Sequence, residues 1–211
     1  LVTSQLWIKG DLRLRPDLIV YINGLPLVFI ELKNSNIPIR NAYDDNLRRY
    51  KKQIPLLFRY NALCMLSNGI ETKIGTFSSG YEYFFNWLRP ESEKQVPDKQ
   101  RIKDYGVSLD YAVLGICEKK RLLDYLENFI FFYNDTVKIS AKNHQYLGVN
   151  NAVDNFALRL QHDKDGTDEA NKGKLGVFWH TQGSGKSYSM IFFTKKIFRQ
   201  FTGNYTFLIV T

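Results

Sequence analysis

Hydrophobic and polar positions in the first third of the chain predict a β-hairpin with charges at one end. The stretch "RPDLIVYINGLPLVFIELKN", residues 15–34, contains two apolar runs that meet at Asn23-Gly24. An Asn-Gly pair between two such runs is typical of a two-residue hairpin turn. Asp17 precedes the first run, and Glu31 and Lys33 close the second. The pattern therefore gathers three charges at the open end of a very hydrophobic hairpin.

Further apolar runs extend this hairpin into an α/β unit covering residues 1–88. The additional predicted elements are a strand in residues 1–9, a helix from about Asn41 to Gln53, and strands in residues 62–69 and 71–79. Pro55 marks the end of the helix or a kink in it, since proline interrupts helical hydrogen bonding. A second Asn-Gly pair, Asn68-Gly69, joins the last two strands.

The next segment, residues 89–140, is predicted to be a polar linker followed by connecting helices. Its first part, within "LRPESEKQVPDKQRIKDYG", carries two prolines and many charges, which indicates a boundary. Leu, Ile and Phe then recur at helical spacing from about Leu122 to Phe132. We expect these helices to serve packing rather than chemistry.

A second unit is predicted to occupy residues 141–211. Its expected elements are a helix in residues 142–161, a strand in residues 175–180, a Gly-rich turn, a helix in residues 188–201 and a strand in residues 205–211. Strand, phosphate-type loop, helix and strand in that order form a βαβ unit of a parallel sheet. Such a unit leaves an unpaired edge, so we expect local disorder or unusual packing after Lys174.

The Gly-rich turn "HTQGSGKS", residues 180–187, predicts a nucleotide-phosphate loop. Its glycines allow successive backbone N–H groups to face phosphate oxygens, Lys186 can reach the β- and γ-phosphates, and Ser187 can bind Mg²⁺. His180 replaces the glycine of the strict pattern. Upstream, the amide of Gln145 suits the edge of an adenine. The expected ATP-binding residues are Gln145, Thr181, Gln182, Gly183, Ser184, Gly185, Lys186 and Ser187.

The charged hairpin end has two interpretations from spacing alone. Glu31 and Lys33 project from the same face of a strand, and the turn brings Asp17 close to Glu31. Together with the Leu32 carbonyl, the two carboxylates form a hard oxygen site for Mg²⁺, with Lys33 as an electrostatic partner. A cross-strand salt bridge at a sheet edge is the alternative.

Basic residues also crowd the helix that follows the hairpin. They are Arg48, Arg49, Lys51 and Lys52. They form either a solvated basic face or a grip on a DNA backbone near the metal, and the neighbouring acids favour the second interpretation.

Composition restricts the class of protein further. The 211 residues are 44% hydrophobic, which excludes a disordered polymer, and the formal net charge of +8 favours a polyanionic partner. Cys64 and Cys117 form no metal-binding pattern, no apolar run is long enough to span a membrane, and no signal peptide is visible. A reducing cytoplasm is therefore expected. The chain begins at Leu1 without methionine, and we expect it to be part of a longer protein.

The quoted hairpin resembles the PD-(D/E)xK nuclease core in the restriction (R) subunit of type I restriction–modification enzymes. "IPLLFRYN" with "SNG", "HQYLGVNNAV" and "VFWHTQGSGKS" resemble successive blocks of that family in the same order. The resemblance implies a restriction-endonuclease-like mixed sheet with flanking helices, followed by the beginning of a RecA-like parallel-sheet P-loop domain. It also implies Mg²⁺-dependent cleavage of double-stranded DNA, coupled to translocation driven by ATP, that restricts unmodified foreign DNA.

The family resemblance also carries residue roles and partners. Asp17, Glu31 and Lys33 fall on catalytic positions, and Tyr50 falls on the tyrosine of a Gln-x-x-x-Tyr motif in which Asn46 replaces the glutamine. M (methyltransferase) and S (specificity) subunits are the implied partners, in the cytoplasm of a bacterium or archaeon. The alternatives are another nuclease–helicase fusion, of a repair or type III-like system, and a non-catalytic nuclease fold that binds DNA or docks a partner.

Overall fold

The computed structural model describes residues 1–210, which divide into two compact units. The first contains residues 1–140 and the second begins at Ala141. The units are described separately below.

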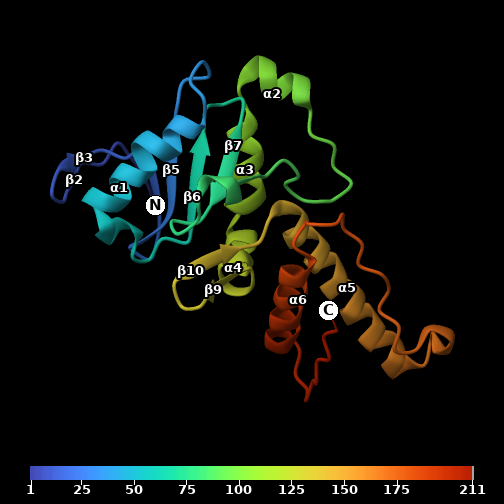
Figure 1. Cartoon of the computed structure of the whole chain (residues 1–211). Coiled ribbons are helices and arrows are strands. Elements are labelled where there is room, and N and C mark those ends of the chain that lie inside the picture. Colours follow the sequence, from blue (N-terminus) through green and yellow to red (C-terminus); the bar gives the residue numbers. More distant parts are fainter. Residues whose placement is uncertain (211) are drawn as a thin grey trace. The chain divides into compact units, whose positions relative to one another are not determined.

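The first unit is built on a six-stranded mixed sheet with strand order β1-β4-β5-β6-β7-β8 (Figure 1). Its strands are β1 Val2–Ser4, β4 Leu18–Ile22, β5 Leu25–Leu32, β6 Leu63–Ser67, β7 Thr72–Gly75 and β8 Phe85–Asn86. Strands β5 and β6 are parallel, and every other neighbouring pair in this sheet is antiparallel. The mixed sheet that the sequence predicted is therefore present in this unit.

The predicted hairpin is confirmed as β4 and β5, with Asn23 and Gly24 in the turn. Both residues have positive φ, 50° and 81°, as the tight turn between twisted strands requires. The expected strand in residues 1–9 divides into β1 and a separate strand β2, Ile8–Lys9, which pairs with β3, Arg13–Leu14. Gln5, with φ of 49°, lies where the chain changes direction between β1 and β2.

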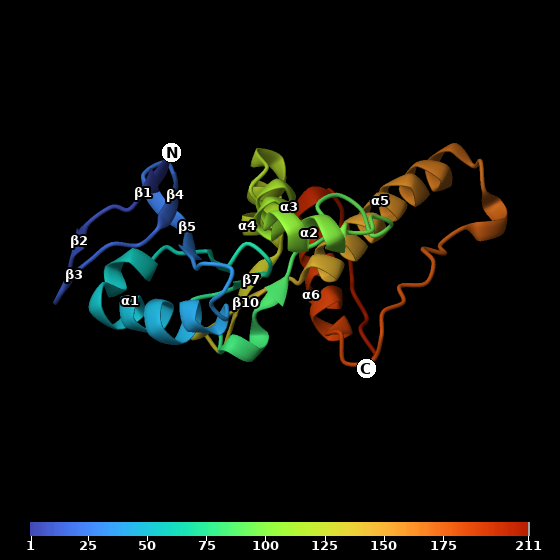
Figure 2. The ribbon, with the colours of Figure 1, turned by 90° about the horizontal axis from the view of Figure 1, so that it is seen from above.

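The predicted helix after the hairpin is confirmed, although its first part is more loosely wound. Residues Ala42–Leu47 (η1) form π-helical turns, and α1 continues them over Arg48–Gln53. Pro55 opens a short 3₁₀ helix, η2 Pro55–Phe58. Figure 2 shows α1 on one face of the sheet and α3 and α4 on the other. The core against α1 includes buried Phe29, Leu47 and Leu66.

Residues 89–140, predicted to be a polar linker and connecting helices, contain helices and cluster with the first unit. They contain α2 Lys99–Tyr105, α3 Ser108–Ile116, α4 Lys119–Asn128 and the hairpin β9 Ile130–Tyr133 with β10 Val137–Ser140. A short 3₁₀ helix, η3 Tyr81–Tyr83, precedes them. The helical spacing expected to reach Phe132 ends at Asn128, because the chain extends into β9.

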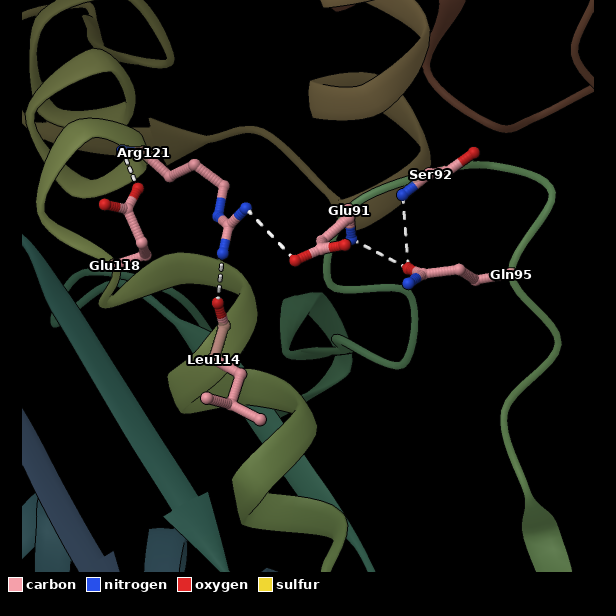
Figure 3. Close-up of polar contacts among 6 residues, drawn as sticks. All are labelled: Glu91, Ser92, Gln95, Leu114, Glu118 and Arg121. Atoms are coloured by element: carbon pink, nitrogen blue, oxygen red, sulfur yellow. Dashed lines mark hydrogen bonds and ion pairs between the residues drawn. The ribbon is translucent and has the colours of Figure 1, made fainter.

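Arg121 connects the parts of this segment (Figure 3). Its guanidinium donates to the Leu114 carbonyl at the end of α3 over 2.6 Å and lies 3.9 Å from the Glu91 carboxylate. The Gln95 side chain in turn accepts from the backbone N–H groups of Glu91 and Ser92 at 2.8 and 3.2 Å. These contacts explain why a stretch rich in Pro and charge is folded here.

The second unit contains two long helices and a short 3₁₀ turn. They are α5 Asn143–Asp165, η4 Glu169–Asn171 and α6 Lys186–Gln200. Both helices were predicted. Phe156 of α5 packs edge-on against Phe193 of α6, with ring centroids 6.5 Å apart.

The two strands predicted in the second unit, residues 175–180 and 205–211, are wrong over the described residues. Residues 175–180 and 205–210 form no strand, and Val177 and Leu208 are 93% and 89% exposed. A strand requires neighbours for its backbone N–H and C=O groups, and none is present in residues 141–210. The exposure of these apolar residues agrees with the unusual packing expected after Lys174. Thr211, the last residue of the second predicted strand, lies outside the described residues.

Candidate active site and nucleotide loop

The charged residues of the hairpin meet where β4 begins and β5 ends, at the open end of the hairpin and inside the sheet rather than on an edge strand. Leu18 pairs with Ile30, which sets Asp17 opposite Glu31 where β5 approaches its end. The backbone N–H of Leu32 donates to Asp17 Oδ2 over 2.8 Å. Lys33 Nζ lies 3.4 Å from Glu31 Oε1. The structure thus brings together the three residues that the sequence predicted to be close.

Glu31 is a buried carboxylate with unused hydrogen-bonding capacity. Its side chain is 2% exposed, and within residues 1–210 its Oε2 atom makes no hydrogen bond. Burial, reinforced by the negative charge of Asp17, raises the pKa of Glu31 to about 7, although Lys33 and the backbone of Asp17 act in the opposite direction. A buried acid with a free oxygen beside a second acid is suited to a divalent cation, because the cation would compensate both charges.

The donor set at this end of the hairpin fits Mg²⁺ rather than a softer metal. The facing ligands are two carboxylates, and across the described part of the chain no three His, Cys, Asp or Glu side chains are grouped as a metal site. Mg²⁺ is commonly bound by one or two carboxylates together with waters and substrate phosphates. Asp17 and Glu31 are the carboxylates here that could hold such a cation, and Mg²⁺ binding by them stays a prediction.

The helix opposite the hairpin contributes Tyr50 and Asn46 to the same region. The Tyr50 hydroxyl donates to the Arg15 carbonyl over 3.2 Å, and its ring packs edge-on against Phe29 at 5.6 Å. Burial, and next the negative charge of Glu31, raise the pKa of Tyr50, while a hydrogen bond from the Asn46 side chain lowers it. Tyr50 therefore lies within electrostatic reach of Glu31 and Asp17, and Asn46 is connected to this region by its hydrogen bond to Tyr50, although its side chain is shorter than that of glutamine.

The four basic residues of this helix do not share one surface. Arg49 and Lys52 are exposed, and Arg48 is exposed beside Asp44 at 3.7 Å. Lys51 instead turns inward and donates to the Phe77 carbonyl over 2.8 Å, and burial lowers its pKa. A DNA-facing role for Lys51 is not supported by this placement, because its ammonium group is already engaged within the unit.

Several backbone and hydroxyl groups contact the site residues and were not predicted from the sequence. The Gln5 N–H donates to the Asp17 carbonyl at 2.8 Å, and the Lys33 N–H donates to the Ser67 carbonyl at 2.7 Å. Behind Ser67, a buried chain of hydroxyls runs to Thr72 at 2.7 Å and from there to Ser108 at 2.8 Å. The sequence feature that could have indicated these groups is the presence of two hydroxyl residues, Ser67 and Thr72, on either side of the Asn68-Gly69 turn, next to apolar strands.

The Gly-rich loop of the second unit adopts the backbone that its glycines predict. Gly183 and Gly185 have φ of 74° and 85°, a region that favours glycine. Helix α6 begins at the next residue, Lys186, whose ammonium donates to the carbonyls of His180 and Thr181 at 2.9 and 3.1 Å. Thr181, Gln182, Gly183 and Ser187 are exposed. The loop thus precedes a helix N-terminus, as a phosphate site requires.

Gln145 fastens this loop to α5. Its side chain is buried, its amide donates to the Gly185 carbonyl over 2.9 Å, and its oxygen accepts from the Lys142 backbone over 2.8 Å. Its neighbour His144 lies 3.0 Å from the Ser184 carbonyl. The polar atoms that the sequence assigned to adenine are therefore engaged with the phosphate loop in this structure, and an adenine contact by Gln145 stays a prediction.

Two family models match the chain in the order that the sequence resemblance implied. Residues 1–83 match the N terminus of type I restriction enzyme R proteins, and residues 144–211 match the SWI2/SNF2 ATPase family. No helix in the described part of the chain is both long and apolar enough to cross a bilayer.

Curated relatives match almost the whole chain. The endonuclease subunit of the type I restriction enzyme HindI from Haemophilus influenzae is 37% identical over 201 residues, covering 91% of this chain and 18% of the relative. A protein of Methanocaldococcus jannaschii, provisionally named the MjaIXP endonuclease subunit of a type I restriction enzyme, is 34% identical over 208 residues, covering 92% and 19%. The chain spans about a fifth of the length of these relatives.

Proposed function

We propose that this chain supplies the DNA-cutting centre of a type I restriction enzyme, a proposal supported by the match of residues 1–83 to the N terminus of type I restriction enzyme R proteins. The observation that carries the proposal is the facing pair Asp17 and Glu31, with a buried carboxylate oxygen that makes no hydrogen bond. An ordinary cross-strand salt bridge would not bury a second acid beside the first, because like charges repel and burial disfavours ionisation.

Asp17 and Glu31 would hold Mg²⁺, which when bound supplies Lewis acidity and an activated water for phosphodiester hydrolysis. Lys33, with its side chain 19% exposed, can neutralise charge that develops on the phosphate. Tyr50 and Asn46 support the centre from the helix side. The Tyr50 hydroxyl holds the Arg15 carbonyl and so fixes the chain that leads to Asp17.

A second part of the proposal concerns ATP. The loop containing Gly183, Gly185 and Lys186 would bind the phosphates, and Ser187 would contribute to an Mg²⁺ shell, at the beginning of a RecA-like translocase domain. The left-handed glycines and the match of residues 144–211 to an ATPase family support this assignment. Translocation would then require the remainder of a longer protein, since this chain spans about a fifth of its relatives.

The proposed partners follow from the same reasoning. Double-stranded DNA is the substrate, and M and S subunits would supply methylation and sequence recognition within the complex. Such an enzyme would restrict unmodified foreign DNA in the cytoplasm of a bacterium or archaeon.

Variants of the intact subunit, assembled with M and S subunits on circular DNA, test the proposal. Lys33→Ala should abolish DNA cleavage while ATP turnover continues, and Lys186→Ala should abolish turnover. The matched control is Lys99→Ala, which removes an exposed lysine from α2 and should change neither activity. Retained cleavage in Lys33→Ala would mean that the hairpin end is structural, as in a nuclease fold used only for docking.

A further inference from the structure

Next to the acidic centre, residues 6–15 form a small arm that the cleavage chemistry leaves without a role. The arm consists of β2 and β3 with the turn between them, and it lies beside the C-terminal end of α1 (Figures 1 and 2). On its inner side, Leu14 is buried and Ile8 packs against the core. On its outer side, Trp7 is 52% exposed.

The outer side of the arm is basic and already ordered. The guanidinium carbons of Arg13 and Arg15 lie 5.1 and 5.2 Å from the centroid of the Trp7 ring. Both arginines and Lys9 are exposed, against a single acid, Asp11, at the turn. Stacking on an aromatic ring restricts the arginine rotamers while leaving their N–H donors open to a phosphate.

The arm is held firmly in place. The Asp11 N–H donates to the Gln53 carbonyl at the end of α1 over 3.3 Å. At Gly10 a Cβ would lie 2.1 Å from that same carbonyl oxygen, so only glycine allows the turn to approach α1 this closely. A turn pinned by backbone contacts presents its side chains without a large ordering cost on binding.

Both ends of the arm lie close to Asp17. At its start the Gln5 N–H donates to the Asp17 carbonyl at 2.8 Å, and at its end the Arg15 carbonyl accepts from Tyr50. Arg15 is two residues from Asp17, a span of about 7 Å at most. That distance is comparable to about two base-pair steps along the axis of B-DNA.

We propose that residues 6–15 are a DNA-binding arm, in which Arg13 and Arg15, ordered by Trp7, bind phosphates of the strand that enters the Asp17–Glu31 centre. The inference rests on the proposed nuclease function and adds the surface that positions its substrate. The outer side of the arm carries three cations and one acid, which suits the phosphates of a DNA backbone better than a protein partner with few acidic residues.

The test measures binding of the chain to duplex DNA of arbitrary sequence by fluorescence anisotropy over a range of salt concentrations, with Ca²⁺ replacing Mg²⁺. Arg13→Gln/Arg15→Gln should reduce the slope of log K against log[salt] by about 1.8, since each phosphate contact contributes about 0.9. Trp7→Ala should weaken binding several-fold, and Trp7→Phe should restore much of it. The matched control, Lys119→Gln/Lys120→Gln, removes the same charge from exposed positions of α4 and should leave the slope unchanged.

If Arg13→Gln/Arg15→Gln gives the same salt-dependence slope as the control variant, the proposal that residues 6–15 bind DNA is wrong. That result would leave residues 6–15 to a protein partner or to no partner. A parallel Mn²⁺ titration separates this failure from failure of the nuclease proposal. If Mn²⁺ binding is intact and does not depend on Glu31, the metal centre is wrong, and with it the assignment of the arm to that centre.

Discussion

Replacing Glu31 by glutamine should stabilise the chain at neutral and higher pH. Burial and Asp17 raise the pKa of Glu31 from its ordinary value of 4.5 to about 7. The folded state therefore holds this proton more tightly than the unfolded state. The stabilisation from the protonated form is complete below pH 4.5 and is lost as the pH rises to about 7.

The size of this effect follows from the two pKa values. Each pKa unit corresponds to about 1.4 kcal/mol, so ionising Glu31 in the folded state costs about 3 kcal/mol, as an order of magnitude. Glutamine keeps the shape of the neutral acid. At pH 8 Glu31→Gln should thus unfold with a free energy about 2–3 kcal/mol above that of the wild type, and at pH 4.5 the difference should nearly vanish.

Urea denaturation of both proteins between pH 4.5 and 8, without divalent cations, measures this difference. Comparing the two proteins at each pH cancels the other titrating groups. Glu82→Gln, which neutralises an exposed carboxylate of the same unit, should follow the wild type at every pH. A Glu31→Gln protein that is less stable than the wild type at pH 8 would refute the argument, since Glu31 would then be stabilising as an ion.

Two further variants test the packing of the first unit and the phosphate loop of the second. Gly115→Ala should destabilise the chain by about 1–3 kcal/mol in urea denaturation, because an added Cβ would lie 2.1 Å from Trp87 Nε1, whereas Leu114→Ala at an exposed position of the same helix should have little effect. Equal stability of Gly115→Ala and the wild type would mean that α3 is not packed on Trp87. Gln145→Ala removes the 2.9 Å hydrogen bond to the Gly185 carbonyl and should speed amide hydrogen exchange in residues 181–187. The control Gln161→Ala, near the other end of α5, should leave that exchange unchanged. Unchanged exchange in Gln145→Ala would show that the Gln145 amide does not hold the loop.

Local patterns were sufficient for the hairpin and for the proximity of its charges. Asn23-Gly24 fixes the turn, and the period of two along the strands then places Asp17 opposite Glu31 and directs Glu31 to the same face as Phe29. The helix carrying Tyr50 was equally readable, because its apolar spacing and the following proline depend only on neighbours in sequence.

Features that depend on distant partners were not predictable in this way. Within residues 141–210 there are no strands with which residues 175–180 and 205–210 could pair, so apolar side chains there stay exposed. The first part of residues 89–140 looks like a linker by composition, yet the segment is attached to the sheet, because the Ser108 hydroxyl contacts Thr72 and the Lys138 carbonyl accepts from Thr76. Lys51 turns inward because its ammonium donates a hydrogen bond to the Phe77 carbonyl, far along the chain.

The central claim is that Asp17 and Glu31 form a divalent-metal centre. Titration calorimetry of the chain with Mn²⁺ at pH 8, comparing wild type, Glu31→Gln and Glu82→Gln, tests it most directly. The account predicts a binding isotherm in the wild type and Glu82→Gln that is lost or weakened at least about tenfold in Glu31→Gln. Identical isotherms in all three proteins would contradict it and leave the charged hairpin end with a structural role only.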